Sequence, residues 1–300
     1  MKILLFGANG QVGWELQRSL QPLGELIALD RHSTELCGDL TDLNGVAETV
    51  RQVLPNVIVN AAAYTAVDKA EADVEVAHRV NTEAPGVLAQ AANAANAWLV
   101  HYSTDYVFDG GGSKPWVETD PTGPLSVYGR TKLEGERLVA SQCVKHLIFR
   151  TSWVYSARGN NFAKTMLRLA SEREALNVIN DQFGAPTGAD LLADVTAHAV
   201  AQVLRQPELA GLYHLAARGE TTWFDYVKYV VDQSIHVREA PEIIAKVINP
   251  VASSAFVTAA KRPHNSRLNT TKLQRSFNLQ LPPWQRGVAR MLAEAQNISP

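Results

Sequence analysis

The sequence predicts an α/β protein with a doubly wound parallel sheet and a smaller C-terminal lobe. Short apolar runs alternate with helical segments from residue 1 to about residue 155. Such alternation is typical of a parallel sheet with right-handed crossovers. Beyond that point prolines divide the chain into shorter segments. We therefore expect a first domain over 1–155 and a second over 156–300 that is partly interleaved with it.

The strongest of these observations concerns the N-terminal segment. Residues 1–6 form an apolar run, expected as a buried strand, and Gly7, Gly10 and Gly13 follow in G-x-x-G-x-x-G spacing. A helix is expected over 14–20 and a second strand over 25–30, which ends at Asp30. Strand, glycine turn, helix, strand and acid in this order are typical of a Rossmann-like dinucleotide-binding unit.

Each part of this unit suits a dinucleotide. Glycines let a pyrophosphate approach the backbone, and the free amides at a helix start attract phosphate. Asp30 can accept both hydroxyls of an adenosine ribose. Further on, Asp39 and Leu40 could flank an adenine ring, although a strand end followed by a helix cap explains them about as well.

The remaining elements follow from periodicity. Further strands are expected at 56–63, 98–103 and 147–150, and helices at 41–53, at 70–97 with a kink near Pro85, and from Ser126 onward. The segment from Gly110 to Pro124 is expected as a flexible loop, either a surface feature or a lid over a substrate. The second half should contain helices near 160–172, 189–205, after Trp223 and at 284–296, with strands near 176–179 and 211–215.

Composition excludes several classes of protein. A formal net charge of −2 gives no electrostatic reason to expect nucleic acid or an anionic membrane as a partner. Cys37 and Cys143 match no metal or redox spacing, and the eight histidines show no ligand spacing. No apolar stretch approaches the length of a membrane span, and the first residues enter a strand rather than a signal peptide. We expect a cytoplasmic protein.

Tyr128 and Lys132 form the candidate catalytic pair. Their spacing of four puts both side chains on one helix face. A free tyrosine has a pKa near 10, so a neighbouring ammonium is expected to lower the pKa of Tyr128. Such a tyrosine could protonate a carbonyl oxygen while hydride arrives on its carbon. Thr104, at the end of a predicted strand, could hydrogen-bond the same oxygen.

Taken together, the glycine turn, the strand-end Thr104 and the Tyr128–Lys132 pair resemble the extended short-chain dehydrogenase/reductase family. The resemblance rests further on the segments 60–68, 103–110 and 150–155, and 181–187 and 261–263 extend it into the second half. Within the family, the chain is similar to reductases that act on dTDP-sugars. The resemblance implies reduction of the C4 keto group of dTDP-4-dehydro-L-rhamnose by NADH or NADPH.

The resemblance also implies roles for individual residues. The cofactor would be held by Gly7, Gly10, Gln11, Val12, Gly13, Asp30, Arg31, Asp39, Leu40, Ala62, Ala63, Tyr64, Tyr128 and Lys132. Tyr128 would be the proton donor, tuned by Lys132 and assisted by Thr104. The sugar would contact Thr104, Asp105 and Trp153, and Lys261 or Arg262 could meet the diphosphate. Such reductases can be homodimers with Mg²⁺ on acidic side chains, for which Glu15, Asp190 and Glu294 are candidates.

Two other functions stay open at this point. A sugar-nucleotide epimerase or dehydratase would use the same scaffold, although Tyr106 stands where a dehydratase needs a second acid. Similar chains also serve as non-catalytic regulatory subunits of methionine adenosyltransferase. Cofactor preference is open as well, because Asp30 favours NADH while Arg31 and His32 could offset its repulsion of the extra phosphate of NADPH.

Overall fold

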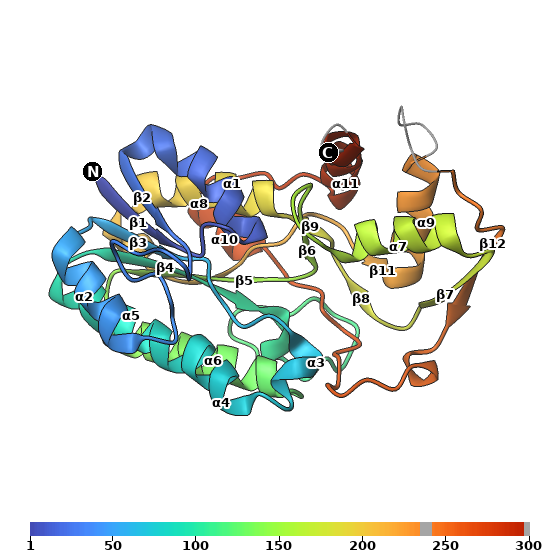
Figure 1. Cartoon of the computed structure of the whole chain (residues 1–300), viewed down its shortest axis with the longest axis horizontal. Coiled ribbons are helices and arrows are strands. Elements are labelled where there is room, and N and C mark those ends of the chain that lie inside the picture. Colours follow the sequence, from blue (N-terminus) through green and yellow to red (C-terminus); the bar gives the residue numbers. More distant parts are fainter. Residues whose placement is uncertain (235–241, 297–300) are drawn as a thin grey trace.

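A six-stranded parallel sheet forms the centre of the computed structural model, which describes residues 1–234 and 242–296 (Figure 1). The strand order is β10-β5-β4-β3-β1-β2, and every pairing is parallel. The strands are β1 (Lys2–Phe6), β2 (Glu25–Leu29), β3 (Val57–Asn60), β4 (Trp98–Thr104), β5 (His146–Thr151) and β10 (Gly211–His214). The predicted doubly wound α/β fold is confirmed.

Helices cover both faces of this sheet (Figure 1). On one face lie α1 (Gln11–Leu20), α8 (Ala189–Val203) and α10 (Thr271–Ser276), and on the other α2 (Leu43–Val53), α5 (Ala84–Ala94) and α6 (Val127–Gln142). Side chains alternate along β1: Ile3 and Leu5 join the core under α1 and α8, whereas Leu4 and Phe6 join the core under α2 and α5. Burial on both faces explains why this strand is apolar throughout.

The segment expected as one helix over 70–97 is divided, so that prediction is wrong in detail. The structure has α3 (Val67–Ala70), α4 (Val74–His78), a π turn (Arg79–Glu83) and then α5. Pro85 lies at the start of α5, directly after the π turn. The irregular turn before it places Asn81 against the segment that follows β3.

The second half of the chain divides between the sheet and a separate lobe (Figure 1). Helix α8 packs on α1, and β10 extends the main sheet beside β5. The lobe contains α7 (Phe162–Glu172), α9 (Trp223–Ser234), α11 (Trp284–Gln296) and a parallel pair of β7 (Ala175–Ile179) with β12 (Val247–Val251). Short strands join the two parts: β6 (Val154–Tyr155) with β9 (Thr187–Gly188), and β8 (Phe183–Gly184) with β11 (Thr221–Thr222).

The carboxyl ends of the strands bring the predicted site residues to one edge. The chain leaves β1 for β2 on one side and later returns to β3 on the other, so the edge beyond β1 and β3 is the switch point at which such sheets bind ligands. Thr104 ends β4 at this same edge. None of the described helices is both long and apolar enough to cross a membrane.

Candidate active site

The glycine turn after β1 is built for close approach. Gly7 has φ +87°, and a Cβ there would lie 2.7 Å from the Ala62 nitrogen. A Cβ on Gly13 would lie 1.9 Å from the Gly7 carbonyl oxygen, so only glycine permits this contact between α1 and the turn. Gly10 caps α1 without a side-chain hydrogen bond. The helix start therefore presents backbone amides and its positive dipole end to the edge, as a pyrophosphate requires.

Two residues tie this turn to its neighbours. The Gln11 amide oxygen accepts a hydrogen bond of 3.2 Å from the Ser156 hydroxyl, which links the start of α1 to the segment after β6. Val12 is partly buried and packs against the core beneath the sheet. The turn therefore has a fixed position relative to the second lobe.

Asp30 lies at the end of β2, where the sequence predicted it. Its carboxylate accepts hydrogen bonds from the Asn9 side-chain amide and, at 2.7 Å, from the His32 backbone N–H. Arg31 is exposed beside it. Asn9 was not among the predicted site residues, because an amide inside a glycine turn has no spacing of its own to mark it.

Asp39 and Leu40, the two proposed adenine neighbours, have different structural roles in the fold. Asp39 accepts a hydrogen bond of 2.9 Å from the Thr41 backbone N–H, which closes a turn before α2. Leu40 is only 3% exposed and belongs to the core between the sheet, α2 and α5. Its side chain therefore has a structural use whether or not an adenine lies beside it.

The segment after β3 runs along the same edge. Ala62 and Ala63 are partly buried small residues, and the Ala62 N–H donates to the Asn60 amide oxygen at 3.1 Å. The Tyr64 backbone N–H donates to Asn81 at 2.9 Å, and the Tyr64 hydroxyl donates to Asp73 at 2.7 Å. Asn81 thus anchors this segment, a role that no sequence pattern indicated.

Helix α6 brings the catalytic candidates to the edge. The Ser126 hydroxyl accepts from the Gly129 N–H at 3.2 Å and caps the helix, so Tyr128 lies in its first turn and Lys132 one turn later. Thr104, at the end of β4, lies near enough to Tyr128 to lower the pKa of its phenol. The ring of Tyr106 packs edge-on against the ring of Tyr128 at 5.6 Å.

The expected lowering of the pKa of Tyr128 by Lys132 is not what the structure shows. Burial raises the pKa of Tyr128 to about 12, more than the hydrogen bond with Thr104 lowers it. The Lys132 ammonium is directed at the Tyr102 carbonyl oxygen, 2.6 Å away, and burial lowers the pKa of Lys132 to about 8. Tyr128 is therefore fully protonated near neutral pH, as a proton donor must be.

Asp105 is the most perturbed carboxyl group of the edge. It is 2% exposed, and burial raises its pKa to about 7 in spite of hydrogen bonds with Ser266 and Thr104. One of its oxygens, Oδ2, has no hydrogen-bond partner among the described residues. A buried oxygen with spare acceptor capacity suits a ligand hydroxyl. Ser266 was not among the predicted site residues, because it lies 161 residues after Asp105 in the sequence.

Trp153 belongs to an aromatic stack between the lobes. Its backbone has φ +49°, and its ring stacks on Trp223 with centroids 3.5 Å apart. Gly184 permits this position, because a Cβ there would lie 2.6 Å from the indole. Phe162 also packs on Trp223, with the ring centroids 4.3 Å apart. Trp223 and Phe162 face the pocket, and neither was predicted as a site residue.

A pocket of about 820 Å³ opens in the second lobe beside these aromatic rings. Its size suits a ligand as large as a nucleotide sugar. Among its described lining residues, Leu125 comes from the first half of the chain, just before α6. Apolar and aromatic side chains alternate in its wall with the cations Arg173, Lys261 and Arg262. Arg262 also pairs with Asp68 at 2.6 Å, across the two halves.

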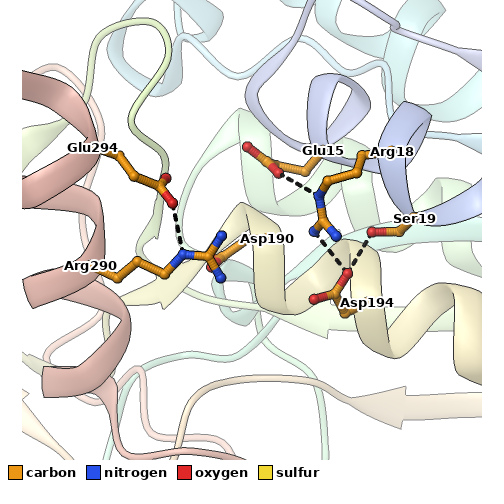
Figure 2. A network of polar contacts seen from close by, with 7 residues as sticks. All are labelled: Glu15, Arg18, Ser19, Asp190, Asp194, Arg290 and Glu294. Carbon is orange, nitrogen blue, oxygen red and sulfur yellow. Dashed lines mark hydrogen bonds and ion pairs between the residues drawn. The ribbon is translucent and has the colours of Figure 1, made fainter. Parts of the chain in front are cut away.

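The three acids proposed for Mg²⁺ do lie near one another (Figure 2). Glu15, Asp190 and Glu294 line one small pocket between α1, α8 and α11. Burial raises the pKa of Glu15, and the other two acids add to the rise. The three acids are therefore neighbours, and the expected ion stays a prediction at this point.

Two arginines occupy the position that a cation would need (Figure 2). Arg290 pairs with Glu294 at 2.7 Å and with Asp190 at 3.6 Å, and Arg18 pairs with Glu15 at 3.6 Å. No group of three metal-binding side chains converges within the described residues. Each of the three carboxylates is therefore already paired with an arginine, and the set as arranged does not fit Mg²⁺.

The fold and this edge define a class of protein. A parallel sheet with a glycine turn that admits no Cβ at Gly7 or Gly13, followed by an acid after β2, is typical of a dinucleotide site. A protonated tyrosine one turn from a lysine, beside a strand-end threonine, adds the features of a short-chain dehydrogenase/reductase of the extended kind.

Comparison with known proteins narrows this class. The family model "RmlD substrate binding domain" matches residues 1–297. The chain is 62% identical over 295 residues to dTDP-4-dehydrorhamnose reductase of Salmonella typhimurium and 61% identical over 295 residues to that of Escherichia coli K12, covering 98% of each chain. The crystal structure of dTDP-4-dehydrorhamnose reductase from Bacillus anthracis in complex with NADP is similar with a TM-score of 0.86 at 34% identity, covering 98% of this chain and 99% of that one. The chain belongs to the RmlD family.

Proposed function

We propose that this chain reduces the C4 keto group of dTDP-4-dehydro-L-rhamnose to give dTDP-L-rhamnose, with NADPH or NADH as the hydride donor. The observation that carries the proposal is the meeting of Tyr128, Lys132 and Thr104 at the edge that begins with the Gly7 turn. High identity to named reductases over nearly the whole chain supports the same substrate.

The residues present fit a nicotinamide dinucleotide. Gly7 and Gly13 let the turn pack tightly on its own backbone, so that the start of α1 can present its amides to a pyrophosphate, and Asp30 with Arg31 would meet the adenosine ribose. Ala62, Ala63 and Tyr64 would line the path toward the nicotinamide, and Lys132 would hold its ribose. When bound, the cofactor supplies the hydride for C4. Because Asp30 opposes a 2′-phosphate while Arg31 accepts one, we propose that both cofactors work.

Tyr128 supplies the proton. Its raised pKa keeps the phenol protonated, so its O–H can donate to the keto oxygen as negative charge develops there. Thr104 holds the same oxygen in place. The cationic form of Lys132 stabilises the phenolate that remains after the proton has left.

The second lobe would hold the rest of the substrate. The diphosphate would meet Lys261 or Arg262, and the nucleoside would occupy the pocket beside Trp223 and Phe162. At the sugar, the unpaired oxygen of Asp105 would accept a hydroxyl, and Trp153 would pack against the ring. We extend the proposal to a cytoplasmic homodimer that supplies rhamnose for cell-surface polysaccharide such as O-antigen.

One assay tests the proposal. The purified chain is mixed with dTDP-4-dehydro-L-rhamnose and either NADPH or NADH, and the nicotinamide absorbance is followed. We expect one cofactor to be consumed for each dTDP-L-rhamnose formed. An epimerase or dehydratase would change the sugar without net cofactor consumption, and a regulatory subunit would change neither. Either result would refute the reductase assignment.

A further inference from the structure

A buried chain of polar groups lies behind Lys132. The Ala62 N–H donates to Asn60 Oδ1 at 3.1 Å, and Asn60 Nδ2 lies 3.3 Å from His101 Nδ1. His101 Nε2 lies 3.3 Å from Lys132 Nζ. Asn60 and His101 are each 1% exposed and Lys132 is 2% exposed, so bulk solvent does not reach these groups. The chain thus connects the cofactor edge at Ala62 with the proposed catalytic lysine.

Counting donors along this chain fixes the histidine tautomer. The Ala62 N–H can only donate, so the Asn60 side chain must turn its oxygen toward it and its NH₂ toward His101. The Nδ1 atom of His101 therefore accepts. Burial and the charge of Lys132 lower the pKa of His101, which keeps the ring neutral. A neutral ring that accepts at Nδ1 carries its proton on Nε2.

This tautomer turns an N–H toward Lys132. An ammonium group has three donors and no acceptor, whereas a neutral amine can accept one hydrogen bond. When Lys132 is charged, its N–H and the His101 Nε2–H are both donors and face each other without an acceptor. Every group in the series from Ala62 to Lys132 has a hydrogen-bond partner only when Lys132 is neutral. Besides His101, the charged group that acts on Lys132 is Glu136 on the next turn of α6. Glu136 is itself held by Arg150 of β5 at 2.7 Å.

We propose that His101 is a positioning residue, locked by Asn60 in its Nε2–H tautomer, that sets the ease with which Lys132 gives up its proton. The inference rests on the proposed function only for its effect on turnover. Since charged Lys132 stabilises the phenolate of Tyr128, the alkaline limit of activity follows the protonation of Lys132. Asn60 and His101 thereby act on the reaction without touching the substrate.

Two variants test the role of the His101 tautomer, one by changing the tautomer and the other by replacing the imidazole. In Asn60→Asp the carboxylate accepts from both Ala62 and His101, so the proton moves to Nδ1 and Nε2 can accept from the ammonium. In His101→Gln the side-chain amide can turn its oxygen toward Lys132 without adding charge. We expect both variants to move the alkaline limit of kcat upward by about one pH unit or more.

The control is His146→Gln. His146 is also partly buried and its ring contacts a backbone carbonyl, that of Cys143, at 2.7 Å, but it lies at the start of β5 away from the catalytic edge. We expect its pH profile to match that of the wild type. An unchanged alkaline limit in His101→Gln would overturn the proposal. This result would not depend on whether Asn60→Asp folds normally.

A second measurement needs no substrate. Side-chain ¹⁵N NMR of the histidines reports the tautomer, with His101 assigned by its absence in His101→Gln, and ¹³Cε NMR reports the titration of Lys132. We expect the Nε2–H form in the wild type and a Lys132 titration that rises in both variants. A wild-type proton on Nδ1 would overturn the proposal. If turnover is absent but these spectra hold, the proposed function fails and this inference stands.

Discussion

At the scale of single residues, Tyr128 is the sharpest test of the chemistry. Tyr128→Phe removes the proton donor and keeps the ring, so we expect kcat to fall by about 10²- to 10⁴-fold with cofactor affinity unchanged. Turnover and cofactor titration measure the two effects. Tyr226→Phe is the matched control, because its buried hydroxyl has no hydrogen-bond partner among the described residues. Near-normal turnover in Tyr128→Phe would remove Tyr128 from the mechanism.

The buried carboxyl group of Asp105 lowers the free energy of unfolding at high pH. Its pKa is about 7 in the folded protein and near 3.8 without the fold, so the folded chain binds the proton more tightly. As pH rises from about 4 to 7 the unfolded state loses this proton first, and folding becomes less favourable. The penalty is complete above pH 7.

Asp105→Asn should therefore stabilise the protein at high pH. We expect the free energy of unfolding to rise at pH 8 by as much as about 4 kcal/mol, and by less at pH 5. Urea unfolding at both values measures it, with the exposed Asp232→Asn as the control for removal of a negative charge. If Asp105→Asn changed the free energy of unfolding equally at pH 5 and pH 8, burial would not raise the pKa of Asp105. A loss of substrate affinity is expected in the same variant.

At the scale of elements, the position of α6 depends on glycines that lie against neighbouring backbone, and Gly135 is one of them. A Cβ on Gly135 would lie 2.1 Å from the Asn81 carbonyl oxygen in the π turn. Gly135→Ala must therefore push α6, with Tyr128 and Lys132, away from its neighbour. We expect a loss of about 1–3 kcal/mol in the free energy of unfolding and a further fall in kcat. Thermal unfolding and turnover measure both.

The control for this helix is Arg137→Ala, which changes an exposed position two residues further on. Surface changes of this kind usually stay within about 0.5 kcal/mol. If Gly135→Ala behaved like the control, the close packing of α6 on the π turn would not be what sets the position of Tyr128.

Local patterns explain which elements could be predicted. The β1 strand, the Gly7 turn and the Tyr128–Lys132 face each follow a fixed period along the chain, so the sequence predicts them directly. The π turn within the 70–97 segment contains Asn81, whose partners at Tyr64 and Thr131 are distant in sequence. No local propensity encodes such a contact.

The same difference separates the site residues. Asp30 was predictable because an acid follows β2 at a known distance from the glycine turn. The roles of Ser266, Trp223 and His101 depend on which segments the fold brings together, and a single serine, tryptophan or histidine has no spacing to reveal that. The pKa of Tyr128 was predicted in the wrong direction because burial of its phenol, and of Lys132, cannot be read from their spacing.

At the scale of the whole molecule, contacts between the two halves complete the site. The pocket lies almost wholly in the second lobe, whereas Tyr128 and the glycine turn belong to the first. The halves meet through the Asp68–Arg262 pair, the Ser156–Gln11 hydrogen bond and the cluster around Glu15. The second half would therefore hold the nucleoside of the substrate, while the first half would hold the cofactor and contact the sugar.

The arginine–carboxylate cluster of Figure 2 joins α1, α8 and α11, and it leads to a prediction about metal dependence. Because Glu15, Asp190 and Glu294 are each paired with Arg18 or Arg290, we expect a chelator to change neither turnover nor the melting temperature. Arg290→Met should cost less than about 1 kcal/mol, since its pairs are largely exposed. With Arg290 gone, the acids would repel one another, and added Mg²⁺ should then raise the melting temperature of the variant.

The matched control is Arg168→Met, which breaks an exposed pair with Glu172 of the same i,i+4 kind on α7. It removes an equal charge but leaves no cluster of acids, so Mg²⁺ should not affect its melting temperature. If a chelator lowered the melting temperature or the turnover of the wild type, an ion rather than the arginines would balance these carboxylates. The arginine side chains would then have to move outward to admit it, and the contact between α11 and the sheet layer would depend on metal concentration.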